Sequence, residues 1–544
     1  MLRNWAYFLV VFAVTVGVFA INARNDFIRL DDIDYIAQNG NIKDGLTPSS
    51  ARWAFGAVGY SSNWHPLTWI SHAADVTIAN VLGLDYAEET NPLGYWARMD
   101  SPFAKFVHAE NVVLHALCAA LLLWVILLLM RGDSIPSSDD FVVASFFSLL
   151  WALHPLRVEV VAWAAERKEL LSVLFMLITM GLYLKGRLSY AIVAFALALL
   201  AKPVAVGLPV VLFAVDVCRG KAELKRLIPY CGLAAATCAL TMLAQEGALQ
   251  MGRDIPVGAR ILCALEAPVI YLWQTVCPVG LSVDYALPGK ASWPVAVLGA
   301  ALVASLPCVC LLWLRRRNAW TNLGMLAIAW CYVGLVPMLG IVKVGNQPHS
   351  DRYTYWIGCG MAAVAALAVL KLSEKWRIQI RNQNVRYTCL VLLIVLSSAT
   401  FVRSLVWKDN LTLFRDAVSK SHNEEKTQIL AEELSRIGLL TEARHVLCET
   451  MDARGSADAY GEFALFLSIN GSSAEADLFA RKALEKDGGN PYALGALGMV
   501  AKSRGDAATA AELLEKATAG FPSYQLQTAL EDCRKALSRK AVRE

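Results

Sequence analysis

Long apolar runs recur through the first 404 residues of this 544-residue chain. A run of about 20 apolar residues is long enough to cross the hydrocarbon core of a bilayer as a helix. The composition agrees with this, since 56% of the residues are hydrophobic and 18% are charged, against about 45–50% and about 25% in an average soluble protein. The sequence therefore predicts an all-α polytopic membrane protein and argues against a simple soluble enzyme.

The charge balance and the cysteines exclude two further classes of function. There are 50 basic and 46 acidic residues, and a net charge of +4 is too small to indicate a nucleic-acid partner. Most of the 13 cysteines lie in apolar runs, and Cys308 and Cys310 have the wrong spacing for a CxxC metal site. We therefore expect no nucleic-acid partner and no disulfide framework.

Eleven apolar segments are counted as spans, although several are shorter than the length that a straight span needs. They cover residues 5–22, 109–130, 141–153, 170–184, 189–201, 203–217, 227–243, 293–314, 322–341, 355–372 and 387–404. The first also fits a signal peptide, but we favour an uncleaved anchor because acidic residues of interest follow it closely. Segment 259–277 contains Arg260 and Glu266, and we expect it to lie in the interface or to re-enter the membrane.

The positive-inside rule orients these spans. With the N-terminus in the cytoplasm and 259–277 not crossing, the basic clusters at 185–187, 219–226, 315–317 and 371–386 all face the cytoplasm. The membrane domain, 1–404, then has a large extracytoplasmic first loop, 23–108. The tail, 405–544, is expected on the same outer side.

The tail carries an internal repeat. Gly438, Gly471 and Gly505 are spaced by 33 and 34 residues, and each is followed five positions later by an alanine, in GLLTEA, GSSAEA and GDAATA. A glycine that ends one helix, with small residues where two helices touch, is typical of an α-solenoid of tetratricopeptide-like (TPR) hairpins. Such an array is a candidate site for a protein or peptide acceptor, or it only caps the membrane domain.

On this topology, the charged residues at the span ends share one side of the membrane. The residues singled out are Asp31, Asp32, His65, His154, Arg157, Glu159, Arg167, Lys168, Lys202, Arg352 and Tyr353. A carboxylate can take the proton of an acceptor hydroxyl, and Arg and Lys can hold a phosphate. We therefore expect a site for a lipid-anchored phosphate. Each residue alone also has a plainer explanation, such as a solvated span end or a snorkelling anchor.

Several sequence blocks resemble bacterial membrane glycosyltransferase-like proteins with C-terminal TPRs. The most specific are NWHPLTW and HPLRVEVVAWAAERKELL, and KPVAV and DRYTYW continue the match. These proteins are similar to the transmembrane-and-TPR O-mannosyltransferases, and so to the GT-C superfamily, which uses polyprenyl-phosphate sugars. The resemblance runs in collinear blocks over residues 25–420, with what looks like an insertion between Leu84 and His108.

The resemblance implies an inverting sugar transfer on the periplasmic face of a bacterial inner membrane. It assigns Asp31 or Asp32 as the base or acceptor-orienting acid and Glu159 as a second acidic residue. The basic residues after Glu159 match Arg167 and Lys168.

For the donor phosphate of a polyprenyl-phosphate sugar, the resemblance makes Arg352 the first candidate and Lys202 the second. His65 and His154 shape the pocket, together with Arg157 and Tyr353, or the two histidines ligate a divalent metal as in some GT-C enzymes. No other cofactor is expected.

The leading hypothesis is a polyprenyl-phosphate-dependent glycosyltransferase that modifies a hydroxyl, with protein Ser or Thr as candidate acceptors. A catalytically inactive membrane-anchored TPR scaffold is the first alternative, although it has no need to retain charges at a costly interface. A transporter or flippase is the second, and it would favour charges near mid-bilayer and pseudo-repeated halves, neither of which is clear here.

Overall fold

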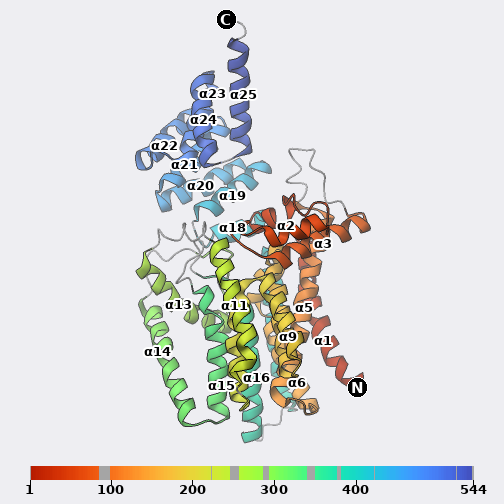
Figure 1. Ribbon diagram of the computed structural model, residues 1–544. Coiled ribbons are helices and arrows are strands. Elements are labelled where there is room, and N and C mark those ends of the chain that lie inside the picture. Colours follow the sequence, from red (N-terminus) through yellow and green to blue (C-terminus); the bar gives the residue numbers. More distant parts are fainter. Residues whose placement is uncertain are drawn as a thin grey trace. The chain divides into compact units, whose positions relative to one another are not determined.

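The computed structural model describes residues 2–84, 99–221, 223–245, 256–285, 293–339, 349–376, 382–421, 423–521 and 523–541. Within these ranges the chain is almost entirely helical, with no β-strand and one isolated bridge between Tyr60 and Asn63. Its contacts divide it into two compact units, Met1–Asp409 and Asn410–Glu544 (Figure 1). The sequence placed this boundary between residues 404 and 405.

Helices of very different length build the first unit. They are α1 (Leu2–Phe19), α2 (Pro48–Gly56), α3 (Pro66–Leu82), α5 (Pro102–Arg131), α6 (Ser138–Ala152), α7 (Val158–Ala162), α8 (Arg167–Leu184), α9 (Leu188–Ala201), α10 (Leu208–Cys218), α11 (Leu224–Ala244), α13 (Val257–Val276), α14 (Trp293–Arg315), α15 (Ala319–Ala327), α16 (Thr354–Trp376) and α17 (Gln383–Val406). Short helical turns join them: η1 (Ala20–Arg24), η2 (Ile33–Ala37), η3 (Pro155–Arg157), η4 (Ala164–Glu166), η5 (Pro203–Gly207), η7 (Ile328–Val333), η8 (Val336–Met338) and η9 (Asp351–Tyr353).

Six helices among the described residues are long and apolar enough to cross a membrane. They cover Asn4–Arg24, Pro102–Arg131, Leu224–Ala244, Trp293–Arg315, Asp351–Ser373 and Gln383–Val406. A seventh candidate is the pair Ser138–Ala152 and Pro155–Ala162, which is bent by 61° at its break. The remaining expected spans coincide with the shorter α8, α9, α10 and α15. The described residues of all eleven segments therefore coincide with helices, while the number that cross the membrane stays a prediction.

Helix α5 organises the core of the first unit. It is 30 residues long and packs against α1, α6 and α8. The contact with α8 is close, because a Cβ added at Gly181 would lie 1.9 Å from a ring carbon of Trp124. Only glycine allows this approach, and the packing fixes the position of α8, whose first turn carries site residues.

The segment expected in the interface forms helix α13. A Cβ added at Gly299 of α14 would lie 1.8 Å from the carbonyl oxygen of Leu265 on α13, so the two backbones are in contact. Whether α13 crosses the membrane stays a prediction.

The second unit consists of consecutive helical hairpins. Its helices are α18 (Asn410–Val418), α19 (Glu424–Arg436), α20 (Leu440–Arg454), α21 (Ala457–Ile469), α22 (Ser473–Lys486), α23 (Pro491–Ser503), α24 (Ala507–Gly520) and α25 (Tyr524–Ala541). Gly438, Gly471 and Gly505 lie at the three hairpin turns with φ of 84°, 86° and 82°, a region that favours glycine. The alanines that follow, Ala443, Ala476 and Ala510, are fully buried, so small side chains let the paired helices approach.

Candidate functional site

The segment between α6 and α8 is buried although it is rich in charge. Residues 151–170 are buried throughout, and they include His154, Arg157, Glu159 and the run from Glu166 to Glu169. Pro155 ends the apolar helix α6, because it lacks an amide donor and disfavours helical geometry in the preceding residue. A buried charge without a partner costs several kcal/mol. The charged side chains of this segment must therefore be paired, and their pairings define the site.

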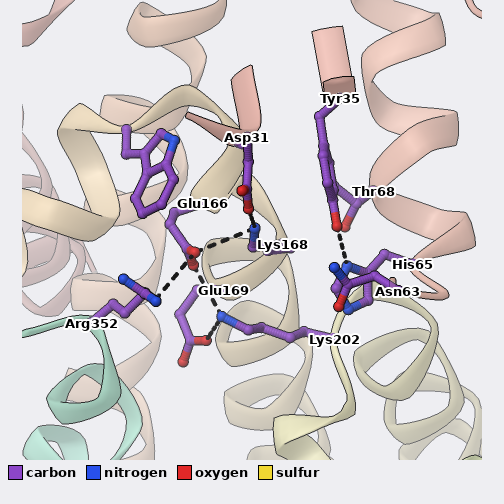
Figure 2. Close-up of polar contacts among 12 residues, drawn as sticks. Asp31, Tyr35, Asn63, His65, Thr68, Glu166, Lys168, Glu169, Lys202 and Arg352 are labelled. Atoms are coloured by element: carbon purple, nitrogen blue, oxygen red, sulfur yellow. Dashed lines mark hydrogen bonds and ion pairs between the residues drawn. The ribbon is translucent and has the colours of Figure 1, made fainter. Parts of the chain in front are cut away.

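Glu166 is the centre of a cluster of ion pairs (Figure 2). Its carboxylate lies 3.0 Å from Lys202 Nζ, 3.4 Å from Lys168 Nζ and 3.6 Å from Arg352 Nε. Glu169 adds a second carboxylate 2.9 Å from Lys202 Nζ. The three cations come from α8, the α9–η5 junction and η9, so the cluster joins segments that lie far apart in the sequence.

Arg352 is held from several sides. Its Nη1 lies 2.5 Å from Glu159 Oε1, and its backbone N–H donates to Glu159 Oε2 at 3.2 Å. Ser350 accepts from Arg352 Nη1 at 2.6 Å and donates to Glu159 Oε1 at 2.9 Å. The guanidinium also lies 5.3 Å from the Trp163 ring and 5.2 Å from the Tyr353 ring. This places Tyr353 beside Arg352, where its ring packs against the cation.

The two adjacent aspartates have different environments. Asp32 is fully buried, and its two oxygens accept the backbone N–H groups of Ile28 at 2.9 Å and Ala165 at 2.7 Å. Burial raises the pKa of Asp32 to about 7. Asp31 is 43% exposed and lies 2.6 Å from Lys168 Nζ. Asp32 therefore ties the first loop to the 151–170 segment, and Asp31 is the aspartate that is exposed to solvent.

Arg167 lies apart from the Glu166 cluster. It pairs with Asp75 of α3 at 2.7 and 2.8 Å and with Glu110 of α5 at 2.9 Å. It also donates to Asn111 Oδ1 at 2.8 Å and to the carbonyl oxygen of Val107 at 2.9 Å. The sequence grouped Arg167 with Lys168 for phosphate binding, but the structure directs its donors to α3 and α5.

His65 contacts the Glu166 cluster through Tyr35. Its Nδ1 is 2.9 Å from the Tyr35 hydroxyl, and Lys168 Nζ lies 4.6 Å from the centroid of the Tyr35 ring. Burial, followed by the nearby Lys168 and Lys202, holds the pKa of His65 well below its usual range. His65 is therefore neutral at physiological pH and sets the position of the Tyr35 ring.

His154 and Arg157 brace the segment against other helices. His154 Nε2 lies 3.1 Å from the carbonyl oxygen of Thr275 at the end of α13. Arg157 donates to the carbonyl oxygen of Thr354 at 2.7 Å and to its hydroxyl at 2.6 Å. These contacts hold η3 against α13 and α16, and they leave both residues outside the Glu166 cluster.

The electrostatics of the cluster centre on Glu166. Burial alone would raise the pKa of this carboxyl, but Lys168, Lys202 and Arg352 outweigh burial and hold the pKa well below its usual range. The cluster contains four carboxylates, Asp31, Glu159, Glu166 and Glu169, against three cations. With all groups ionised the balance is one negative charge, so a ligand phosphate must exchange with carboxylates to reach the cations.

Glu166, Glu169 and Asp75 are not among the site residues predicted from the sequence. Glu166 and Glu169 lie in the same ERKE run as Lys168, and their place in this charged run could have indicated that they belong to the site. Asp75 gave no signal, because it lies within α3 and is 92 residues from its partner Arg167.

The described residues do not gather the ligands of a metal ion. Across the described ranges, no three His, Cys, Asp or Glu side chains are arranged to hold one. His65 and His154, the two proposed ligands, are bonded to Tyr35 and to the Thr275 carbonyl oxygen.

Comparison with known proteins gives one distant likeness. No protein-family model matches the chain. A Caenorhabditis elegans protein described as a protein O-mannosyl-transferase is 23% identical over 430 residues, which cover 76% of this chain. The match spans 57% of the length of that relative. Together with its apolar helices, this makes the chain a helical membrane protein with a distant similarity to a protein O-mannosyltransferase.

Proposed function

We propose that this chain is an integral membrane glycosyltransferase that moves a sugar from a polyprenyl-phosphate donor to a hydroxyl. The observation that carries the proposal is the convergence of Lys168, Lys202 and Arg352 on Glu166, next to the exposed carboxylate of Asp31. The distant likeness to a protein O-mannosyl-transferase supports the same reaction class. We further propose an extracytoplasmic site in a bacterial inner membrane, and a protein Ser or Thr as acceptor.

The donor phosphate is proposed to bind where the carboxylates now hold the cations. Lys202 and Arg352 have side chains that are 15% exposed, so both are partly accessible to an incoming phosphate that displaces their carboxylate partners. Arginine suits this role because its planar guanidinium can bind two phosphate oxygens at once. Lys168 is more deeply buried and lies between Glu166 and Asp31. Its proposed position is therefore between the donor phosphate and the acceptor.

The proposed transfer uses Asp31 as the base. The acceptor oxygen forms a bond to the anomeric carbon while the bond from that carbon to the phosphate oxygen breaks. The electron pair of the broken bond leaves on the phosphate, and the acceptor proton passes to the Asp31 carboxylate. Negative charge grows on the departing phosphate, so the attraction of Arg352, Lys202 and Lys168 is strongest in the transition state.

Donor turnover by the full-length protein in detergent or liposomes tests this proposal. The assay measures release of polyprenyl phosphate from labelled polyprenyl-phosphate mannose in the presence of a Ser/Thr-rich peptide. We expect Arg352→Ala and Asp31→Asn to lose transfer, by about a hundredfold or more if each removes a contact made in the transition state. Arg226→Ala is the matched control, because Arg226 forms an exposed ion pair with Glu223 away from the cluster.

The outcomes separate the glycosyltransferase from the scaffold. Full transfer by both site variants contradicts the assignment of the site. If the wild type binds polyprenyl phosphate but transfers no sugar from any donor tested, the proposed activity is wrong and the scaffold is favoured.

A further inference from the structure

The second unit contains a group of carboxylates that the proposed transfer does not use. Glu424, Glu425 and Glu432 lie on α19, and Asp458 and Glu462 lie on α21. We call these five residues the Glu462 site. Helices α19 and α21 are in contact, and Ser456, directly before α21, donates to Glu424 at 2.6 Å. Burial, followed by the charge of the other four carboxylates, raises the pKa of Glu462.

Four members of the Glu462 site have polar partners. Lys426 Nζ lies 2.7 Å from Glu425, and Ser456 donates to Glu424 at 2.6 Å. Asn490 donates to Asp458 at 2.6 Å, and Gln428 donates to Glu432 at 3.2 Å. One cation is therefore paired within a group of five carboxylates.

Glu462 differs from these four. Its side chain is 5% exposed, and its Oε2 is buried with no hydrogen-bond partner in the described part of the chain. A buried carboxyl without a partner costs about 1–3 kcal/mol, and more when it is charged. A ligand that supplies a cationic donor would satisfy it.

The neighbourhood of Glu462 indicates which cation fits. A Cβ added at Gly461, directly before Glu462, would lie 3.0 Å from Tyr492 Cβ, so an aromatic side chain of α23 lies beside the carboxylates. A carboxylate next to an aromatic ring suits a guanidinium, which donates in its plane and stacks through its face. A divalent metal fits less well, since no three carboxylates among the described residues are arranged to ligate one.

We propose that the Glu462 site binds an arginine side chain of a polypeptide, with the guanidinium donating to Glu462 and lying beside Tyr492. The other four carboxylates attract the cation and speed its association. This inference does not depend on the proposed sugar transfer, because it concerns residues of the second unit alone.

Binding of labelled peptides to the full-length protein in detergent, without any sugar donor, tests the site. The probes are a short fluorescent Gly-Ser peptide with one central arginine and the same peptide with citrulline, which is neutral but of the same shape. We expect the arginine peptide to bind about tenfold more tightly or better, and Glu462→Gln to remove that preference. Glu485→Gln, on the exposed surface of α22, is the matched control and retains it.

Any of three other results would overturn the proposal. Equal binding of the two peptides shows that the charge is not recognised. A preference that survives in Glu462→Gln and also in Asp458→Asn places the peptide elsewhere. Displacement of the arginine peptide by an equal concentration of spermidine identifies a site for free polyamines rather than for a polypeptide. Since no donor is present, these results are independent of the transfer assay.

Discussion

Replacement of Glu462 by glutamine is expected to stabilise the second unit, and the gain should grow with pH. Burial, together with four neighbouring carboxylates, raises the pKa of Glu462 from its ordinary 4.5 to about 9. Between these two values the folded chain binds more protons than the unfolded chain, so stability falls as the pH rises. The loss begins near the unfolded pKa and is complete above the folded pKa.

The size of this loss follows from the two pKa values. Each pH unit within the window costs about 1.4 kcal/mol, so ionisable Glu462 lowers the stability of the folded unit by about 3 kcal/mol at pH 7. Glutamine keeps the shape of the side chain and cannot ionise. We therefore expect the variant and the wild type to be similarly stable near pH 4.5, and to differ by about 3 kcal/mol at pH 7.

Alkylation of Cys533 in the full-length protein can measure this difference. Cys533 is 3% exposed in the core of the second unit, so it reacts when the unit opens. If labelling follows the opening equilibrium, 3 kcal/mol corresponds to labelling about a hundredfold slower in Glu462→Gln at pH 7. Comparison of both chains at the same pH removes the pH dependence of the thiol, and Glu485→Gln is the control. A ratio that does not change between pH 5 and pH 8, or faster labelling of Glu462→Gln, would refute this reasoning.

Three further predictions concern the first unit and are read out as thermal unfolding of the full chain in detergent. Asp32→Asn should destabilise by about 1–3 kcal/mol, because an amide can accept only one of the two backbone N–H groups that Asp32 satisfies; unchanged stability would show that these bonds are weak. Asp75→Asn should cost about 3 kcal/mol, because it removes the bidentate partner of buried Arg167, and a neutral result would mean that Glu110 compensates fully. Gly299→Ala should cost about 1–3 kcal/mol of stability through overpacking against Leu265. In the control, Gly232→Ala on α11, the added Cβ meets nothing within 4 Å and the substitution should be neutral or slightly stabilising. Equal effects of the two substitutions would contradict the close contact of α13 and α14.

The helices could be predicted from the sequence because apolar length is a local property. The described residues of all eleven apolar segments coincide with helices, and the glycine spacing of the tail predicts its three turns, where the glycines have positive φ angles. The bend between α6 and α7 has a local cause in Pro155. The number of crossings depends on the membrane and on short helices such as α9, so the apolar pattern alone does not determine it.

The candidate site could be predicted in part. The expectation that charges gather at one membrane face placed Asp31, Glu159, Lys168, Lys202 and Arg352 together, and the structure brings these five into one cluster. Their pairing could not be predicted, because which of two adjacent residues turns inward depends on packing. Asp32 and Arg167 turn into the protein, while their neighbours Asp31 and Lys168 join the cluster. Their order along the chain gives no signal for this difference.

The pairing of Lys168 with Asp31 has a consequence for the order of events in the proposed reaction. While Lys168 holds an oxygen of Asp31, that oxygen is not available to an acceptor hydroxyl, and Lys168 can turn toward a phosphate only by releasing Asp31. Arrival of the donor would thus free the base, and arrival of the acceptor alone would not. The two substrates should therefore bind in an obligatory sequence with the donor first, and steady-state inhibition by polyprenyl phosphate should be competitive with the donor and noncompetitive with the acceptor. Such a protein would keep Asp31 unavailable as a base until the sugar donor is bound.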